Sequence, residues 1–215
     1  MTVESLKAGT GSETGEVLKI GFSDGSQLSL KIPYLPDEYR ESEYFFPGKE
    51  LSDPEERALR FAAACYRAER AALRLVARAE QTCRGTSLKL QRRGHPAPPV
   101  AAVISRLMSL EILSDERYAV RWLRSRLGRS GESPLRLLAG LRRRGIAAAA
   151  AQEALHSVLD FETELALLKG YLTGRAYGRA CGPNGRAYGL KREGFSGPVI
   201  AHLLEAEDAA AEGEP

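Results

Sequence analysis

The sequence is poor in the residues that catalysis, metal binding and disulfide formation require. Its three cysteines, Cys65, Cys83 and Cys181, form no Cys-x-x-Cys pair, and an odd number suits a reducing compartment. The three histidines stand apart from one another, so none has the nearby ligand that a zinc site needs. A GxxxxGK[ST] phosphate loop and a GxSxG nucleophile elbow are also missing. We therefore expect a cytoplasmic protein without enzymatic activity, cofactor or metal.

Long apolar runs are missing as well. No stretch approaches the 18 apolar residues of a membrane-spanning helix, and we expect no contact with a membrane. Residues 1–15 are polar and glycine-rich, without the apolar segment of a secretory signal, and we expect them to be disordered. Hydrophobic residues nevertheless make up 43% of the chain, which is enough for a packed core.

A short pattern occurs three times: a helix-sized segment ends in basic residues and is followed by glycine. The glycines are Gly94, Gly145 and Gly194, at intervals of 145 − 94 = 51 and 194 − 145 = 49 residues. Glycine after a basic last turn is typical of a helix C-terminus, since glycine adopts a positive φ cheaply and cations favour the negative end of the dipole. Apolar residues at helical spacing follow each glycine. The regular period predicts tandem helical repeats.

Positive charge is concentrated in the middle of the chain. Residues 51–150 carry 20 Lys and Arg against 9 Asp and Glu, whereas residues 1–50 carry 5 against 9 and residues 151–215 carry 6 against 10. A solvated helical surface would contain such arginines, but their concentration in one region favours a footprint for a polyanion. The candidate binding residues are Arg92, Arg93, Arg117, Arg121, Arg124, Arg142, Arg143 and Arg144.

The repeats follow a segment of different character. Two alternating stretches, 17–22 and 27–32, flank Asp24-Gly25, a combination that predicts a β-hairpin, which we expect to pack on the first helix. Three consecutive aromatic residues, Tyr44 to Phe46, indicate a contact between the hairpin and the helices, or alternatively a partner-binding surface. Helix starts are indicated at Ser52, Thr82, Ser114 and Ser133.

The expected fold is mainly α, with tandem three-helix, helix-turn-helix-like repeats and a small N-terminal β-hairpin. Its parts are a disordered segment (1–15), the hairpin and connector (16–51), three repeats (52–112, 113–160 and 161–207) and an acidic tail (208–215). In the third repeat, Gly170, Gly174, Gly178, Gly182 and Gly185 predict a short or broken first helix, since each interior glycine costs about 1 kcal/mol.

Several of these motifs, in this order, resemble the RecX family of regulators of the bacterial RecA recombinase. The similar segments are Leu113-Ser-Asp-Glu-Arg-Tyr-Ala119, Gly131-Glu-Ser-Pro-Leu-Arg-Leu-Leu-Ala-Gly-Leu-Arg-Arg-Arg-Gly-Ile146 and Arg192-Glu-Gly-Phe-Ser-Gly-Pro-Val-Ile200. The chain departs from the family pattern at Ser114, which replaces an acid, at Cys83–Thr86 and in the glycine-rich third repeat.

The resemblance implies an elongated, curved array of three repeats. It also implies a monomer that binds in the groove of the recombinase–single-stranded DNA filament and inhibits or modulates the recombinase in recombination and DNA repair. On this reading the eight arginines contact the filament or its DNA. Two alternatives stay open: a helical module that binds duplex DNA directly, and a structural adaptor that docks through Tyr44 to Phe46.

Overall fold

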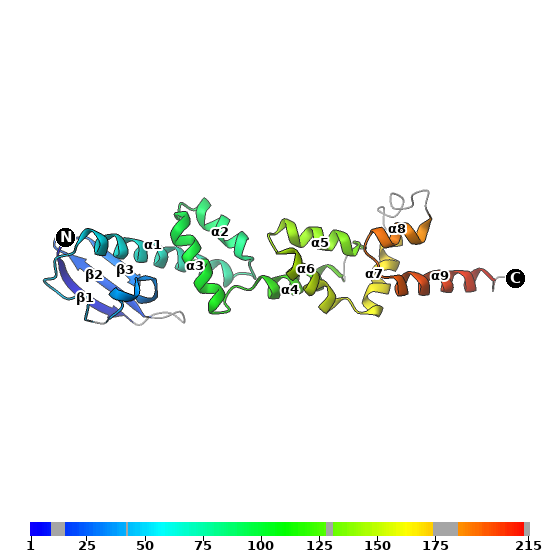
Figure 1. Ribbon diagram of the computed structural model, residues 1–215, viewed down its shortest axis with the longest axis horizontal. Helices are drawn as coiled ribbons and strands as arrows, with labels where there is room; N and C mark the ends of the chain where they lie inside the picture. The colour runs from blue at the N-terminus through cyan, green and yellow to red at the C-terminus, as the bar shows by residue number, and fades with distance from the viewer. Residues whose placement is uncertain (10–15, 42, 128–130, 174–184, 213–215) are drawn as a thin grey trace. The chain divides into compact units, whose positions relative to one another are not determined.

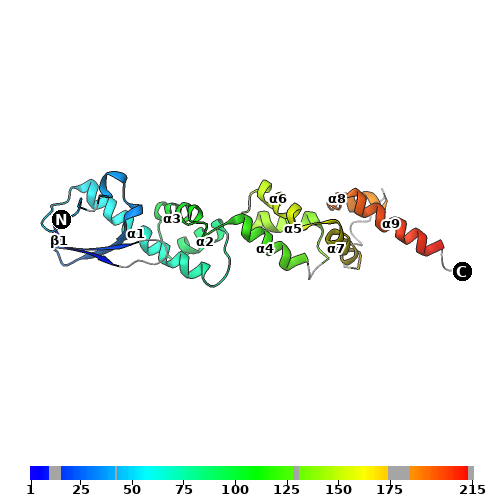
Figure 2. The same ribbon diagram turned by 90° about the horizontal axis from the view of Figure 1, so that it is seen from below.

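The computed structural model describes residues 1–9, 16–41, 43–127, 131–173 and 185–212. In these ranges the chain forms three β-strands, two short 3-10 helices and nine α-helices (Figures 1 and 2). Contacts divide the chain into two compact units, Met1–Ser114 and Asp115–Pro215. Each unit has its own hydrophobic core. The mainly helical fold with a small N-terminal sheet is therefore confirmed.

The first unit begins with a three-stranded antiparallel sheet in the order β1-β2-β3. Its strands are β1 (Val3–Gly9), β2 (Val17–Phe22) and β3 (Gln27–Lys31). The hairpin at Asp24-Gly25 is confirmed: Gly25 has φ = 78°, and the amide of Ser26 donates to Asp24 Oδ1 at 2.9 Å. The turn chemistry of these two residues therefore fixes the pairing of β2 with β3.

Strand β1 corrects the expectation that residues 1–15 are disordered. Val3–Gly9 pairs with β2 along its length, with a register shift between Val3 and Ser5. Val3 is buried in the core, while most other side chains of the strand are at least partly exposed. Backbone pairing therefore orders this segment even though its sequence lacks a strong apolar alternation. Residues 10–15 lie outside the described ranges.

Helix α1 (Asp53–Val76) packs against β3, as expected for the partner of the hairpin. Ser52 and Glu55 form a capping box at its start, which satisfies backbone amides of the first turn. A buried charge network joins the helix to the sheet: Lys31 Nζ lies 2.5 Å from Glu69 Oε1, and the hydroxyl of Tyr34 donates to Glu69 Oε2 at 2.5 Å. The sheet is thus fixed to α1 by polar as well as apolar contacts.

Two of the three consecutive aromatic residues make the contact expected between the sheet region and the helices. Phe45 is buried, and the hydroxyl of Tyr44 donates to Glu55 Oε1 on α1 at 2.7 Å. Phe46 is 54% exposed. Along the sequence, the short helices η1 (Ile32–Tyr34) and η2 (Asp37–Tyr39) come between β3 and these aromatic residues.

The first three-helix repeat is completed by α2 (Cys83–Arg92) and α3 (Ala97–Ser109), which pack on each other and on α1. Thr82 caps α2, since its hydroxyl accepts from the amide of Gly85 at 2.9 Å. The unusual Cys83–Thr86 segment is therefore helical despite its glycine. The buried Thr86 hydroxyl donates to the carbonyl of Thr82 at 2.9 Å.

The second unit contains the other six α-helices of the described chain. They are α4 (Asp115–Leu127), α5 (Pro134–Arg143), α6 (Ala148–Val158), α7 (Phe161–Thr173), α8 (Arg186–Arg192) and α9 (Gly197–Glu212). One core contains buried residues from all six helices, so the second and third repeats share it. None of the described helices is both long and apolar enough to cross a membrane.

The end of the chain departs from the expected boundaries. Helix α7 ends at Thr173; the interrupting glycines Gly174, Gly178 and Gly182 lie outside the described residues. Helix α9 continues to Glu212, so the expected boundary between the third repeat and an acidic tail at 207/208 falls inside a helix. Alanine has the highest helix propensity, and the Ala-rich sequence after Ala206 explains this extension.

Candidate partner-binding surface

The three basic-to-glycine segments end their helices with one shared geometry. Gly94, Gly145 and Gly194 have φ values of 85°, 90° and 91°. After each glycine, the next amide donates back to a buried leucine carbonyl of the helix: His95 to Leu90, Ile146 to Leu141 and Phe195 to Leu190, at 3.2, 3.2 and 3.3 Å. This is the hydrogen bonding of a glycine C-cap. The basic residues are thereby held in the last turn of α2, α5 and α8.

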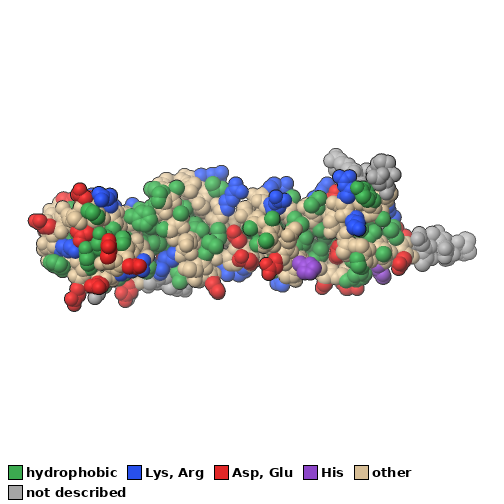
Figure 3. Space-filling view, viewed as in Figure 1, with side chains coloured by type: hydrophobic (Ala, Val, Ile, Leu, Met, Phe, Trp, Pro, Cys, Tyr) green, Lys and Arg blue, Asp and Glu red, His purple; other side chains and the backbone are tan. Residues whose placement is uncertain are grey.

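In the first unit, Arg92 and Arg93 are exposed at the end of α2. Figure 3 shows Lys and Arg side chains gathered over this helix. The neighbouring His95 has its pKa lowered by partial burial and by the charges of Arg67 and Arg93. The lowered pKa favours the neutral imidazole, and the positive charge at the end of α2 comes from Arg92 and Arg93.

In the second unit, Arg117, Arg121 and Arg124 lie exposed on α4. Ala119 and Leu123 of the same helix are completely buried, so α4 has a core face and a basic face. The structure thus places the three arginines on the outward side of the helix, where the sequence spacing predicted them. Their role in binding stays a prediction.

At the end of α5, Arg142 and Arg143 are exposed, but Arg144 is partly buried and bonded within the unit. Its Nη1 donates to the carbonyl of Gly140 at 2.8 Å, and its guanidinium lies 4.6 Å from the ring centre of Trp122 on α4. Such a cation–π contact stabilises by about 0.5–2 kcal/mol. Arg144 therefore fixes the end of α5 on α4 and is less available to a partner than Arg142 and Arg143.

Trp122 and Arg126 belong to the same arrangement but were not among the candidate residues. The Arg126 guanidinium lies 5.3 Å from the Trp122 ring, so arginines from two helices contact one indole. Gly140 permits this contact, because a Cβ on it would lie 2.6 Å from Trp122 Cη2. The spacing of Trp122 and Arg126, four residues apart on one helix, could have indicated their contact from the sequence. The contact of Arg144 on α5 with Trp122 is visible only in the folded structure.

The basic end of α8 meets the start of α5 within the second unit. The Ser133 hydroxyl donates to Glu193 Oε2 at 2.6 Å, and the amide of Leu135 donates to the Glu193 carbonyl at 3.0 Å. Lys191 and Arg192 precede this junction and are exposed. Figure 3 shows basic side chains over both helices. The structure thus brings the basic ends of α5 and α8, with α4, into one unit, while Arg92 and Arg93 belong to the other unit.

No cluster of three or more potential metal ligands occurs among the described His, Cys, Asp and Glu residues. The surface offers exposed guanidinium groups, which suit phosphate or carboxylate groups.

Comparison with known proteins decides the family. The family model for the second three-helix domain of RecX matches residues 114–155. The regulatory protein RecX of Treponema pallidum is 33% identical over 164 residues, which cover 76% of this chain and 99% of that protein. The chain belongs to the RecX family. RecX from Halorhodospira halophila is similar at 33% identity over 150 residues, covering 67% of this chain and 91% of that protein.

Solved RecX structures share the fold. A crystal structure of regulatory protein RecX matches with a TM-score of 0.67 at 20% identity and covers 95% of this chain and 100% of that chain. RecX from Lactobacillus salivarius matches with a TM-score of 0.53 at 21% identity, covering 68% of this chain and 97% of that chain. The helical repeats observed here are thus those of RecX proteins, which are named regulatory proteins.

Proposed function

We propose that this protein is a non-enzymatic cytoplasmic regulator, active as a monomer, that binds in the groove of a recombinase–single-stranded DNA filament and lowers recombinase activity. Membership of the RecX family supports a regulatory role. The observation that carries the proposal is the repeated corner, in which basic residues are held at a helix end by a positive-φ glycine. Three helix ends with the same geometry and positive charge suit a target that is itself repetitive.

The spacing of the corners suits a nucleic-acid strand. Because the end of α8 contacts the start of α5, the two basic ends in the second unit are separated by about the length of α5. Ten helical residues correspond to about 15 Å. A nucleic-acid strand carries one negative charge per about 3.4 Å, so successive corners reach phosphates several nucleotides apart. These contacts are independent of sequence.

Duplex DNA recognition is the competing proposal. Helix-turn-helix proteins read bases with residues near the N-terminus of a recognition helix. Here the candidate arginines of α2 and α5 lie at C-terminal ends, while those of α4 run along an exposed face. This arrangement favours contact with phosphates or acidic side chains over base reading.

Single-stranded-DNA-dependent ATP hydrolysis by the recombinase tests the proposal. We expect the protein to inhibit hydrolysis at stoichiometric ratios. Replacing both Arg142 and Arg143 by Glu, or Arg117, Arg121 and Arg124 by Glu, is expected to weaken inhibition about tenfold or more, about 1.4 kcal/mol, without loss of helicity.

A matched control is the double replacement of Arg70 and Arg74 by Glu on α1, which changes the net charge as much as the Arg142 and Arg143 pair does. Both arginines are exposed and lie outside the candidate surface. The control should inhibit as well as the parent protein. Equal weakening by this control would show that total charge, rather than the basic surface, matters. Tight, sequence-dependent binding to duplex DNA alone would favour the competing proposal.

A further inference from the structure

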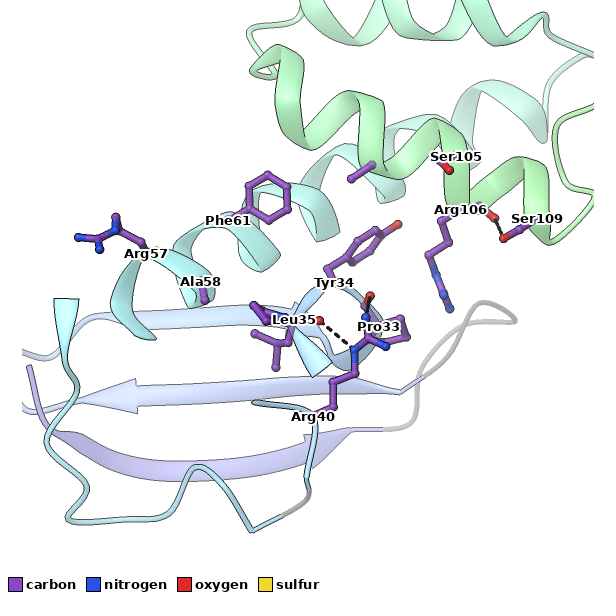
Figure 4. A pocket seen from close by; sticks show the side chains of 12 residues that line it. Pro33, Tyr34, Leu35, Arg40, Arg57, Ala58, Phe61, Ser105, Arg106 and Ser109 are labelled. Atoms are coloured by element: carbon purple, nitrogen blue, oxygen red, sulfur yellow. Dashed lines mark hydrogen bonds between the residues drawn. The ribbon is translucent and has the colours of Figure 1, made fainter. Parts of the chain in front are cut away.

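The first unit contains a groove that the proposed function does not use. It has a volume of about 640 Å³ and lies between the η1 segment, α1 and α3 (Figure 4). Residues of four kinds line it: prolines and aliphatic side chains, two serines, the aromatic rings of Tyr34 and Phe61, and the three arginines Arg40, Arg57 and Arg106. No Asp or Glu is among the lining residues. The groove therefore combines an apolar surface with the positive charge of Arg57, because Arg40 pairs with Asp37 and Arg106 Nε lies 4.0 Å from Glu69 Oε2.

The aromatic residues form the middle of this groove. Figure 4 shows Tyr34 and Phe61 between Arg57 at one end and Arg106 at the other. Tyr34 is buried and its hydroxyl is bonded to Glu69, whereas Phe61 is 37% exposed. An exposed phenyl ring beside proline and alanine side chains offers a contact for an aliphatic or aromatic side chain of a partner.

The arginines differ in what they already contact. Arg40 donates from Nε to the carbonyl of Leu35 at 2.8 Å and pairs with Asp37 at 2.5 Å. Those bonds fix its position beside the apolar residues. Arg57 is exposed and forms no ion pair with the part of the chain that the structure describes. Its guanidinium is thus ready to bind a carboxylate at the mouth of the groove.

We propose that this groove binds an acidic protein segment in which an aromatic or aliphatic side chain stands next to Asp or Glu. The apolar side chain lies against Phe61 and the prolines, and a carboxylate pairs with Arg57. Charge complementarity supports this occupant, since arginine binds carboxylates through paired N–H donors. The site lies within the first unit and is separate from the basic helix ends of the proposed function.

Single-stranded nucleic acid fits the groove less well. Proteins that bind single strands present several exposed aromatic rings on which successive bases stack. Among the described lining residues only Phe61 presents an exposed aromatic ring, because Tyr34 is buried. The aliphatic remainder of the lining suits an apolar side chain.

Fluorescence anisotropy with a labelled peptide, Asp-Glu-Asp-Leu-Phe-Asp-Glu, tests the inference on the full chain. We expect saturable binding of this peptide and no binding of two others. One of these has Asn and Gln in place of the acids, and the other has Ser in place of Leu and Phe. R57E and F61A are each expected to weaken binding about tenfold, because each removes one kind of contact.

The control variant is R67E on the same helix. Arg67 is exposed and lies six residues after Phe61, a rotation of about 240° around the helix, so it faces away from the groove. R67E should bind the peptide like the parent protein. Absence of binding at millimolar peptide would overturn the proposal, and so would an affinity of R57E and F61A equal to that of the parent protein. So would displacement of the peptide by an unlabelled thymidine oligonucleotide from the parent protein and R142E/R143E alike, because that result would make the groove a nucleic-acid site.

Discussion

Gly131 and Gly170 allow two backbone segments of the second unit to approach closely. A Cβ on Gly131 would lie 2.1 Å from the carbonyl oxygen of Gly170, a contact that no side-chain adjustment relieves. We expect Gly131→Ala to lower the free energy of unfolding by about 1–3 kcal/mol, as other overpacking changes do. Urea unfolding followed by circular dichroism measures the change.

Gly197→Ala is the control for that prediction. Gly197 is the first residue of α9, and a Cβ there has nothing within 4 Å. Alanine should therefore be neutral or slightly stabilising. Equal stability of both variants would mean that the segments containing Gly131 and Gly170 separate at little cost.

Glu55 makes the first unit sensitive to acid. Its carboxylate accepts from Ser52, pairs with Lys49 at 2.8 Å and accepts from Tyr44, and the contacts with Lys49 and Ser52 lower its pKa from 4.5 to about 2. A carboxyl whose pKa is lower in the folded protein stabilises it above the unfolded pKa, and this stabilisation is lost as the pH falls from about 4.5 to 2.

We therefore expect Glu55→Gln to flatten the dependence of the melting temperature on pH over that interval. The variant should melt a few degrees lower at neutral pH, since about 1 kcal/mol corresponds to about 2–4 °C for a chain of this size. The two melting curves should converge near pH 2. Glu43→Gln, at an exposed position in the same connector, should leave the profile unchanged. Parallel profiles of melting temperature against pH for the parent protein and Glu55→Gln would show that Glu55 is not the source of the acid sensitivity.

At the scale of elements, the junction between α5 and α8 depends on two side chains. The buried Ser133 hydroxyl donates to Glu193 and also accepts from the amide of Arg136 at 3.4 Å. Ser133→Ala removes both bonds, and we expect it to cost about 1–2 kcal/mol. A double-mutant cycle with Glu193→Gln, measured by urea unfolding, should give a coupling energy of about 0.5–1.5 kcal/mol. Simple additivity would show that the two side chains stabilise their helices separately.

Local chemistry made many elements predictable from the sequence. Asp24-Gly25 indicated the hairpin, Ser52, Thr82 and Ser133 indicated helix starts, and three glycines indicated helix ends. Each signal acts through hydrogen bonds within a few residues of its own position. Strand β1 was missed because a non-local pairing with β2 orders it, and the exposed side chains of Val3–Gly9 carry little apolar pattern.

The candidate surface was only partly predictable for the same reason. Helical spacing was sufficient to put Arg117, Arg121 and Arg124 on the outer face of α4. The partly buried position of Arg144 depends on Trp122, which lies more than twenty residues earlier in the chain. Contacts of this kind are set by the packing of α4 and α5, and the sequence pattern of either helix alone does not show them.

At the scale of the whole molecule, the two cores predict separable folding. Every buried residue of one core lies between Val3 and Leu113, and every buried residue of the other lies between Ala119 and Leu203. We expect the fragment Met1–Ser114 to unfold cooperatively when produced alone, with slow amide exchange in α1. Circular dichroism and hydrogen exchange check this. A fragment with helical content but without a cooperative transition would show that the second unit is needed to stabilise the first.

The single tryptophan of the chain, Trp122, lies beneath Arg144, the residue that follows Arg142 and Arg143 at the end of α5. Indole emission responds to nearby charge and hydration, so this position is a native optical reporter for the candidate surface. A ligand that draws the guanidinium away from the ring, or covers it, will alter the emission of the unlabelled protein. Titrations with a filament or an oligonucleotide can then be read without attaching a dye, and a peptide confined to the groove of the first unit should leave the signal unchanged.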